Sequence, residues 1–290
     1  MPGLKYVQAP AGWSCTDGNP FTPDGSYSSD WSGFCVLDRA DDQFYTGRSK
    51  SGLFSVRFGR KVNHLQNRLA DFLRYENAHG RTVILSFPDD INMDEFVSQA
   101  LSSTPEADVV RPTDPEIVVH STTCRAWAAI RRDGELTASS RLRVEGKLQR
   151  TPSSPSSEMS EIEQYYANEP PEYADYVMFS DIDATTPEKV IASCAQGRFI
   201  LEDDAVYEPG TRLYFDNHRI ITEGLGTRDG LHTMKVRDCL PLAPYLIAAI
   251  GITDVDLAGR TSDWTIKAFV EETNKVFWQR AADGWRREKG

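Results

Sequence analysis

Residues 116–123, with which the second half of the chain begins, have the sequence Glu116-Ile117-Val118-Val119-His120-Ser121-Thr122-Thr123. Its apolar run predicts a strand that carries a histidine and two hydroxyl residues to its end. Trp127 and Ile130 predict a short amphipathic helix after it, and Gly134 predicts a turn into a second strand. Because polar side chains and free backbone N–H groups converge where a strand meets a helix N-terminus, we expect a ligand pocket here.

The composition of the chain is that of a soluble globular protein. Its 290 residues suffice for one large domain or two modest ones, and 40% are hydrophobic and 26% charged. No long apolar run is present and the first residues lack the apolar core of a signal peptide, so we expect no membrane-spanning helix and a cytoplasmic location. The net charge of −11 argues against nucleic acid as the main partner.

The cysteines and the basic residues each leave two interpretations open. The five cysteines are scattered and form no C-x-x-C pair, which argues against a structural zinc site. For Cys15 and Cys35, a disulfide is one alternative, and reduced, buried thiols, which a cytosolic location favours, are the other. The densest basic stretch is either a solvated helix end and strand or a site for nucleotide phosphates. It comprises Arg131, Arg132, Arg141, Arg143, Lys147 and Arg150.

The pattern of the chain predicts an α+β protein with two domains. Residues 1–112 are predicted to form an N-terminal α/β accessory lobe, in which 1–50 are loops and short strands packed by aromatic side chains. Residues 113–290 form the second domain, and the Pro-, Ser- and Glu-rich segment 150–172 is predicted to be a flexible loop. Further strands are predicted at 53–58, 82–87, 176–180, 198–201, 211–215, 219–222 and 231–236, and helices at 62–78, 93–101, 187–195 and 263–281.

Several common enzyme signatures are absent from the sequence, including G-x-S-x-G, the P-loop, G-x-G-x-x-G and H-E-x-x-H. Three segments over about residues 115–250 resemble the ADP-ribosyltransferase superfamily, which includes the poly(ADP-ribose) polymerases and the RNA 2′-phosphotransferases. His120-Ser121-Thr122 resembles its His-Gly-Thr or His-Gly-Ser signature. Residues 175–181 resemble its Tyr-Phe-Ala-Asp strand, and residues 229–236 resemble the strand that carries its third catalytic position.

This resemblance implies a split mixed β-sheet core that uses NAD as its substrate, for ADP-ribosyl transfer to an acceptor or for NAD cleavage. It implies that His120 forms a hydrogen bond with a ribose hydroxyl group and that Ser121 or Thr122 holds the carboxamide of nicotinamide. It also implies that Tyr176 stacks on the nicotinamide ring. An acidic residue or a histidine at the third position would stabilise the oxocarbenium-like cation or take the acceptor's proton. With Arg141 for the pyrophosphate, the candidate site residues are His120, Ser121, Thr122, Arg141, Tyr176, Met178, Ser180, Glu223, Asp229 and His232.

The sequence departs from the polymerase-type His-Tyr-Glu pattern at two positions. Met178 stands where the stacking tyrosine is expected, two residues from Tyr176, and Leu231 or His232 stands in place of the glutamate. The loss of the glutamate favours mono- over poly-ADP-ribosyl transfer. Two other functions stay open: a non-catalytic module that binds a nucleotide or phospho-ligand, and an RNA 2′-phosphotransferase-like enzyme with basic residues around the pocket. In a purely structural interpretation, His120 and His232 are hydrogen-bonded core histidines.

Overall fold

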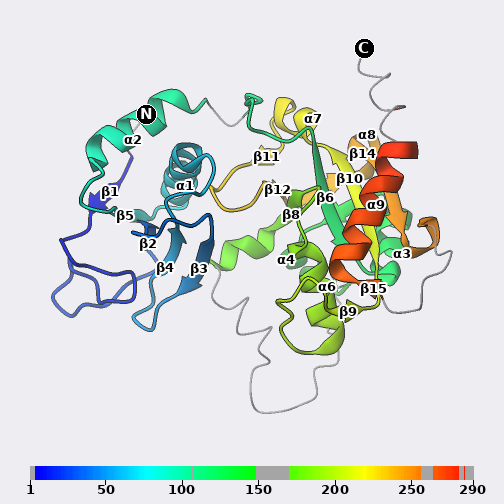
Figure 1. The fold of residues 1–290 in the computed structure, drawn as a ribbon, viewed down its shortest axis with the longest axis horizontal. Coiled ribbons are helices and arrows are strands. Elements are labelled where there is room, and N and C mark those ends of the chain that lie inside the picture. The colour runs from blue at the N-terminus through cyan, green and yellow to red at the C-terminus, as the bar shows by residue number, and fades with distance from the viewer. Residues whose placement is uncertain (1–3, 106–107, 148–169, 256–263, 281–283, 285–290) are drawn as a thin grey trace. The chain divides into compact units, whose positions relative to one another are not determined.

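The computed structural model describes residues 4–105, 108–147, 170–255, 264–280 and 284 (Figure 1). Contacts within the chain divide it into two compact units. Unit 1 comprises the described residues up to Thr113, residues 170–171 and the segment Arg228–His232, and unit 2 comprises the other described residues from Asp114 onward. The predicted boundary after residue 112 lies beside this division. Arg228–His232, which the sequence assigns to the second domain, belongs to unit 1.

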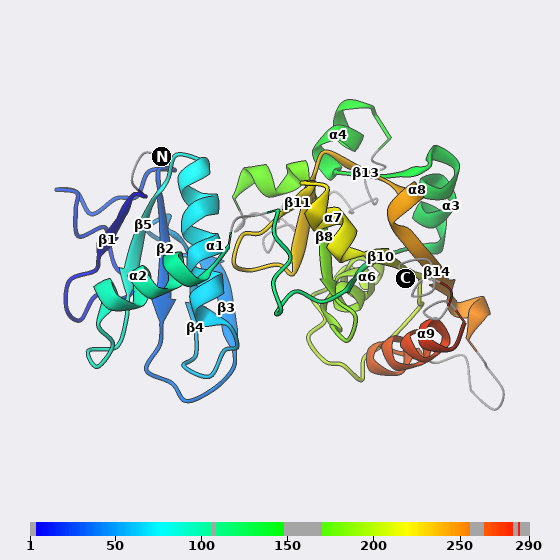
Figure 2. The same cartoon turned by 90° about the horizontal axis from the view of Figure 1, so that it is seen from above.

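Unit 1 is built on a mixed five-stranded sheet. Its strands lie in the order β1 (Tyr6–Gln8), β5 (Thr82–Ser86), β2 (Trp31–Val36), β4 (Phe54–Phe58) and β3 (Phe44–Arg48). The first four strands are parallel to one another, and the edge strand β3 is antiparallel to β4. Helices α1 (Leu65–Ala78) and α2 (Met93–Ser103) lie on one side of this sheet (Figures 1 and 2).

The two faces of the unit 1 sheet are covered differently. Phe34 of β2 packs with Phe58 and with Phe72 of α1, at ring-centroid distances of 5.0 and 5.6 Å. On the other face, Cys15 and Cys35 pack with Leu53. Strand β2 is buried along nearly its whole length, so its sequence does not alternate between apolar and polar residues. For this reason the sequence gives no clear period for it within residues 1–50.

Unit 2 is built on a six-stranded antiparallel sheet. The order is β11 (Gly226–Thr227), β12 (Met234–Arg237), β8 (Tyr176–Asp181), β6 (Ile117–Thr122), β10 (Thr211–Asp216) and β14 (Leu246–Gly251). Each neighbouring pair is antiparallel, whereas the resemblance implies a mixed sheet here. Two small sheets pair β13 (Cys239–Pro241) with β7 (Glu135–Thr137) and β15 (Trp264–Thr265) with β9 (Val206–Tyr207). The prediction of an α+β protein is confirmed.

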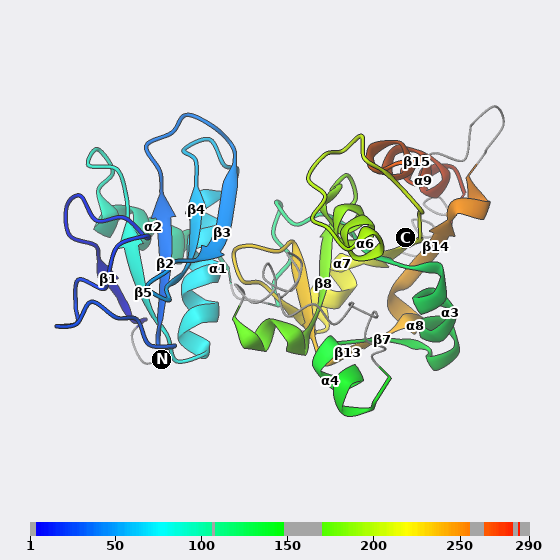
Figure 3. The same cartoon turned by 90° about the horizontal axis from the view of Figure 1, so that it is seen from below.

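The helices of unit 2 connect and cover these strands. They are α3 (Cys124–Asp133), α4 (Ser139–Val144), α6 (Thr186–Gln196), α7 (Asn217–Thr222), α8 (Leu242–Tyr245) and α9 (Ile266–Arg280), with 3-10 turns at Pro171–Asp175 and Ile252–Asp254. Helices α6 and α9 cover one face of the sheet; Figure 3 shows the molecule from below. There Tyr214 of β10 stacks on Phe277 of α9 at 4.4 Å. Among the described residues, none of the helices has the length and apolar character to cross a membrane.

Two predicted strands of the second half are wrong. Residues 198–201 form no strand. Residues 219–222 lie in α7, because Asp216 caps this helix by accepting a hydrogen bond from the backbone N–H of Arg219. The side chains of Ile220 and Ile221 in this helix are fully buried. A short apolar pair such as Ile220-Ile221 fits a strand or a helix equally well by pattern alone. The predicted flexible loop at 150–172 lies outside the described residues except for 170–172.

Gly230 fixes the segment Arg228–His232 in unit 1. It has a φ of +77°, and a Cβ added to it would lie 2.3 Å from the carbonyl oxygen of Arg68 and 3.0 Å from Cβ of Phe72. A side chain would therefore force this segment away from α1, in addition to the cost of a left-handed backbone. A glycine is required here for two independent reasons.

We predict that Gly230→Ala destabilises unit 1 more than Gly12→Ala does. Gly12 has the same φ of +77° in the same unit, but nothing lies within 4 Å of its added Cβ. Gly12→Ala should cost about 1 kcal/mol from backbone strain alone, and Gly230→Ala should cost more because of the overlap. Urea denaturation of the two variants measures the difference. Equal losses would show that the close approach to α1 carries no energetic weight.

Candidate functional site

Strand β6 distributes its polar side chains over the two faces of the unit 2 sheet. It lies between β8 and β10, with His120 directly opposite Leu213 of β10. Because successive side chains of a strand point to opposite faces, Val118, His120 and Thr122 share one face, and Val119 and Ser121 share the other. We call these the His120 face and the Ser121 face. The Ser121 face is the one that α6 and α9 cover.

His120 is half-buried and held by the neighbouring strand. Its Nδ1 donates a hydrogen bond to the carbonyl oxygen of Met178, at 3.0 Å, and its ring meets the edge of Phe179 with centroids 6.0 Å apart. Burial lowers the pKa of His120, so the ring is neutral near pH 7. With the proton on Nδ1, the Nε2 atom carries a lone pair that can accept a hydrogen bond from a hydroxyl group.

The end of the His120 face is shaped by a close approach and a helix start. Thr122 is buried, and a Cβ added to Gly210 would lie 1.9 Å from the carbonyl oxygen of Thr122. Thr123 then caps α3 by accepting the backbone N–H of Ala126 at 3.1 Å. The predicted sequence of strand, hydroxyl residues and helix is therefore present. His120 and Thr122 are the two candidate residues that it brings together on one face.

Ser121 lies on the other face, so of the two residues that the resemblance implies for the carboxamide, Ser121 or Thr122, only Thr122 shares a face with His120. The hydroxyl of Ser121 donates to Glu188 of α6, which is fully buried. Tyr207 donates to the same carboxylate at 2.8 Å, and the fully buried Arg212 of β10 pairs with it at 3.3 Å. The second guanidinium nitrogen of Arg212 donates to the carbonyl oxygen of Ile182 at 2.5 Å. Ser121 therefore stabilises a buried charge network.

Tyr176 also lies on the wrong face to stack on a ligand beside His120. The pairing of Val119 with Ser180 places Ser180, and by alternation Met178 and Tyr176, on the Ser121 face. Tyr176 is buried there, and the ammonium group of the fully buried Lys235 lies 4.5 Å from its ring centroid. The same group lies 4.1 Å from the ring of Tyr173. The aromatic ring that does contact His120 belongs to Phe179, which the sequence analysis did not select.

Arg141 and Glu223 are engaged elsewhere on the surface of unit 2. Arg141 of α4 contacts Glu145 at 2.9 Å, Asp238 at 3.1 Å and Glu135 at 3.4 Å. Three carboxylates already surround its charge, which argues against the pyrophosphate role. Glu223 follows α7, where it pairs with Arg219 at 2.7 Å and accepts a hydrogen bond from the hydroxyl of Tyr245.

The basic stretch is not a cluster of unpaired cations. Lys147 contacts Glu145 at 3.0 Å and Arg132 contacts Asp133 at 2.9 Å, in addition to the three carboxylates around Arg141. Arg131 and Arg143 are exposed, and Arg150 lies outside the described residues. This arrangement agrees with a solvated helix end rather than a phosphate site.

Asp229 and His232 belong to unit 1. The carboxylate of Asp229 is fully buried and accepts the backbone N–H groups of Leu231 and His232, both at 2.9 Å, while its other oxygen lies 2.8 Å from Nδ1 of His232. Arg68 of α1 donates to the carbonyl oxygen of Gly230 at 3.0 Å. The turn is therefore bound to α1 of the same unit.

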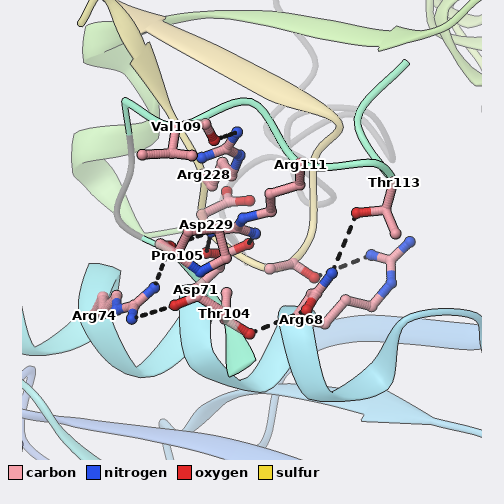
Figure 4. Close-up of polar contacts among 12 residues, drawn as sticks. Arg68, Asp71, Arg74, Thr104, Pro105, Val109, Arg111, Thr113, Arg228 and Asp229 are labelled. Atoms are coloured by element: carbon pink, nitrogen blue, oxygen red, sulfur yellow. Dashed lines mark hydrogen bonds and ion pairs between the residues drawn. The ribbon is translucent and has the colours of Figure 1, made fainter. Parts of the chain in front are cut away.

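A buried ion pair completes this part of unit 1. Arg111 binds Asp71 of α1 through two hydrogen bonds of 2.6 and 2.7 Å. Figure 4 shows Asp71, Arg111 and Asp229 gathered above α1. Four buried charged residues of these ion pairs are not indicated by the sequence: Asp71, Arg111, Glu188 and Arg212. Their signal is weak, because charged residues inside apolar elements look like solvated ones until a partner from another element is known.

Comparisons with known proteins reveal no relative of the chain. No protein-family model matches the chain, and neither the curated proteins nor the solved structures contain a match. Within the part of the chain that the structure describes, no group of three or more His, Cys, Asp or Glu side chains is arranged to hold a metal ion.

We predict that Glu188→Ala destabilises unit 2 by about 3–5 kcal/mol, because it leaves the buried Arg212 without its counter-charge. Lys189→Ala, one residue along the same helix, is the matched control. Lys189 forms a more exposed ion pair with Asp203 at 2.7 Å, and losing it should cost less than about 1 kcal/mol. Urea denaturation measures both. Similar small losses would contradict a structural role for the buried pair.

We also predict that His120 makes the protein less stable in mild acid. Its folded-state pKa lies below the ordinary value of about 6.5, so the unfolded chain takes up a proton before the folded protein does. The stability is therefore intact above about pH 6.5 and falls as the pH drops below it. His120→Gln should remove this part of the acid loss, measured by denaturation between about pH 7 and 5. An unchanged profile would show that His120 binds a proton equally well in both states.

Proposed function

We propose that unit 2 is an ADP-ribosyltransferase-like domain that binds NAD on its His120 face and either transfers the ADP-ribosyl group to an acceptor or cleaves NAD. The observation that carries this proposal is the arrangement of the three segments that resemble that superfamily. The first two lie on β6 and β8, and the third ends on β12, from Met234 onward; these strands are consecutive neighbours of one sheet in the order β12-β8-β6. Segments far apart in the sequence are thus neighbours in one sheet, which supports a shared site.

His120 and Thr122 are the residues on which the proposed site depends. The neutral His120 ring can accept a hydrogen bond from a ribose hydroxyl through Nε2, while Nδ1 stays bound to the Met178 carbonyl and holds the ring in place. In the reaction, the bond between the ribose carbon and the nicotinamide nitrogen breaks, and its electron pair leaves with nicotinamide. The acceptor, or water in the cleavage reaction, then forms the new bond to that carbon and gives up a proton.

The proposal is limited to mono-ADP-ribosyl transfer or NAD cleavage. The third catalytic position of the family falls at Leu231 or His232, whose contacts lie in unit 1, and neither is a glutamate. Of the other two acidic candidates, Asp229 is bound to its own turn, and Glu223 is bound to Arg219 and Tyr245. Chain elongation in the polymerase manner is therefore not part of the proposed activity.

A second candidate is a non-catalytic module that binds NAD or another nucleotide on the same face. The position of Tyr176 favours it, because a tyrosine buried beside Lys235 on the Ser121 face cannot stack on a ligand beside His120. RNA 2′-phosphotransferase-like chemistry has less support. Its substrate requires a basic pocket, and the basic residues around Arg141 are largely paired with carboxylates.

We predict that NAD raises the unfolding temperature of the protein, and that the protein releases nicotinamide from NAD. Ligand at a hundred times its Kd stabilises a folded protein by about 2.7 kcal/mol, which a thermal-shift titration detects readily. His120→Ala should weaken NAD binding at least about tenfold, or about 1.4 kcal/mol. Nicotinamide release should fall with it.

Tyr176→Phe is the control that separates the two faces of the sheet. It keeps the ring on the Ser121 face and should leave NAD binding unchanged. Stabilisation without nicotinamide release would favour the binding module. An absence of any NAD effect on unfolding would exclude both candidates and leave His120 as a core histidine. Equal loss of binding in Tyr176→Phe and His120→Ala would contradict the assignment of the site to one face.

A further inference from the structure

Unit 1 contains a pair of cysteines that the proposed function does not use. Cys15 lies in the turn-rich segment before β2, and Cys35 lies near the end of β2 itself. Both are buried and free, and they pack together with Leu53 beneath the partly buried rings of Trp13, Tyr27 and Trp31. The two thiols therefore lie in one packed cluster. Two thiols in direct contact can form a disulfide without a large rearrangement.

Polar groups surround the Cys15 sulfur on the same face of the sheet. Cys35 pairs with Arg57 of β4, so the two side chains lie side by side, and Ser55 lies two residues away with the same orientation. The hydroxyl group of Ser55 and the positive charge of Arg57 both lower the pKa of Cys15. A cation and several donors stabilise a thiolate.

The two thiols differ in reactivity as a consequence. The Cys35 hydrogen bond, followed by those from the serines and the charge of Arg57, lowers the pKa of Cys15 to about 6. The same hydrogen bond and burial raise the pKa of Cys35 well above its ordinary value. Near pH 7 Cys15 is therefore the thiolate and Cys35 the thiol. In thiol–disulfide exchange, Cys15 would therefore be the attacking thiolate and Cys35 the thiol that resolves the mixed disulfide.

Cys15 lies in a short turn whose neighbouring residues are exposed. Cys15 is buried, but Ser14 and Thr16 on either side of it are exposed. A small local opening of this turn would bring the Cys15 sulfur to the surface. Cys35, on a central strand, has no such route, so an external reagent meets Cys15 first.

We propose that Cys15 and Cys35 form a redox-active dithiol site that exchanges with a small disulfide of the glutathione type. The Cys15 thiolate attacks one sulfur of the small disulfide, which forms a mixed disulfide and releases one thiolate. Cys35 then loses its proton to solvent and attacks the Cys15 sulfur, which forms the Cys15–Cys35 disulfide and releases the second small thiolate. Two protein thiols are oxidised and one small disulfide is reduced to two thiols.

Oxidation would tie the turn-rich segment before β2 to the central strand of unit 1. The bond closes a loop between residues 15 and 35, which restricts the unfolded chain and raises the unfolding temperature of unit 1. The effect lies within unit 1 and does not depend on the proposed NAD chemistry of unit 2.

The test is incubation of the full-length protein with oxidised glutathione, followed by peptide mapping without reduction. We expect one internal disulfide between Cys15 and Cys35, a raised unfolding temperature, and reversal of both by dithiothreitol. Cys124 and Cys194, which are exposed, are internal references for non-specific reaction. Cys35→Ser should trap glutathione on Cys15, and Cys15→Ser should leave Cys35 unmodified.

Two results would overturn the proposal. One is glutathione on Cys124 or Cys194 while Cys15 and Cys35 remain reduced. The other is a wild-type protein that keeps glutathione on Cys15 without closing the internal disulfide. If a serine variant fails to fold, alkylation of the wild-type protein by iodoacetamide still decides the matter. Cys15 should react with a midpoint near pH 6, and a midpoint near the ordinary thiol value of about 8.5 would contradict the site.

Discussion

The alternation of side chains along β6 is the constraint on which unit 2 depends. This strand pairs with β8 and β10, so its two faces must satisfy two different environments. Val119 and Ser121 face the cluster formed with α6 and α9, while His120 and Thr122 face the other way. A shift by one residue would bury the histidine beneath the helices and expose the hydroxyl that binds Glu188. Both the fold and the proposed site therefore depend on the register of this one strand.

Buried ion pairs join elements that are far apart in the sequence. Arg212 and Glu188 connect β10 to α6, and Arg111 and Asp71 connect a loop to α1. Replacing such a pair with apolar residues is often neutral or stabilising, whereas removing one partner is costly. Our hypothesis is that these pairs fix how the elements fit together. Their hydrogen bonds to Ser121, Tyr207 and backbone carbonyls make one arrangement satisfiable and leave other arrangements with unpaired charges.

The two units carry separate chemical properties. Unit 2 presents a neutral, oriented histidine at a strand end, which suits hydrogen bonding to a hydroxyl group more than proton transfer from a charged acid. Unit 1 holds two contacting thiols beside an arginine, which suits thiol–disulfide exchange. The chain also returns to unit 1 with the segment Arg228–His232. The tight fit of Gly230 against α1 makes this return a specific part of unit 1.

The longer elements and the content of β6 can be read from the sequence alone. The apolar periods of α1, α2, β4, β5 and α6 are visible locally, because each depends on neighbouring residues. The sequence could not show that Tyr176 turns away from His120, since that depends on which residue of β6 pairs with which residue of β8. Nor could it place Asp229 and His232 in unit 1. Cross-strand register and long-range docking are set by partners distant in the chain, and only the tertiary structure brings those partners together.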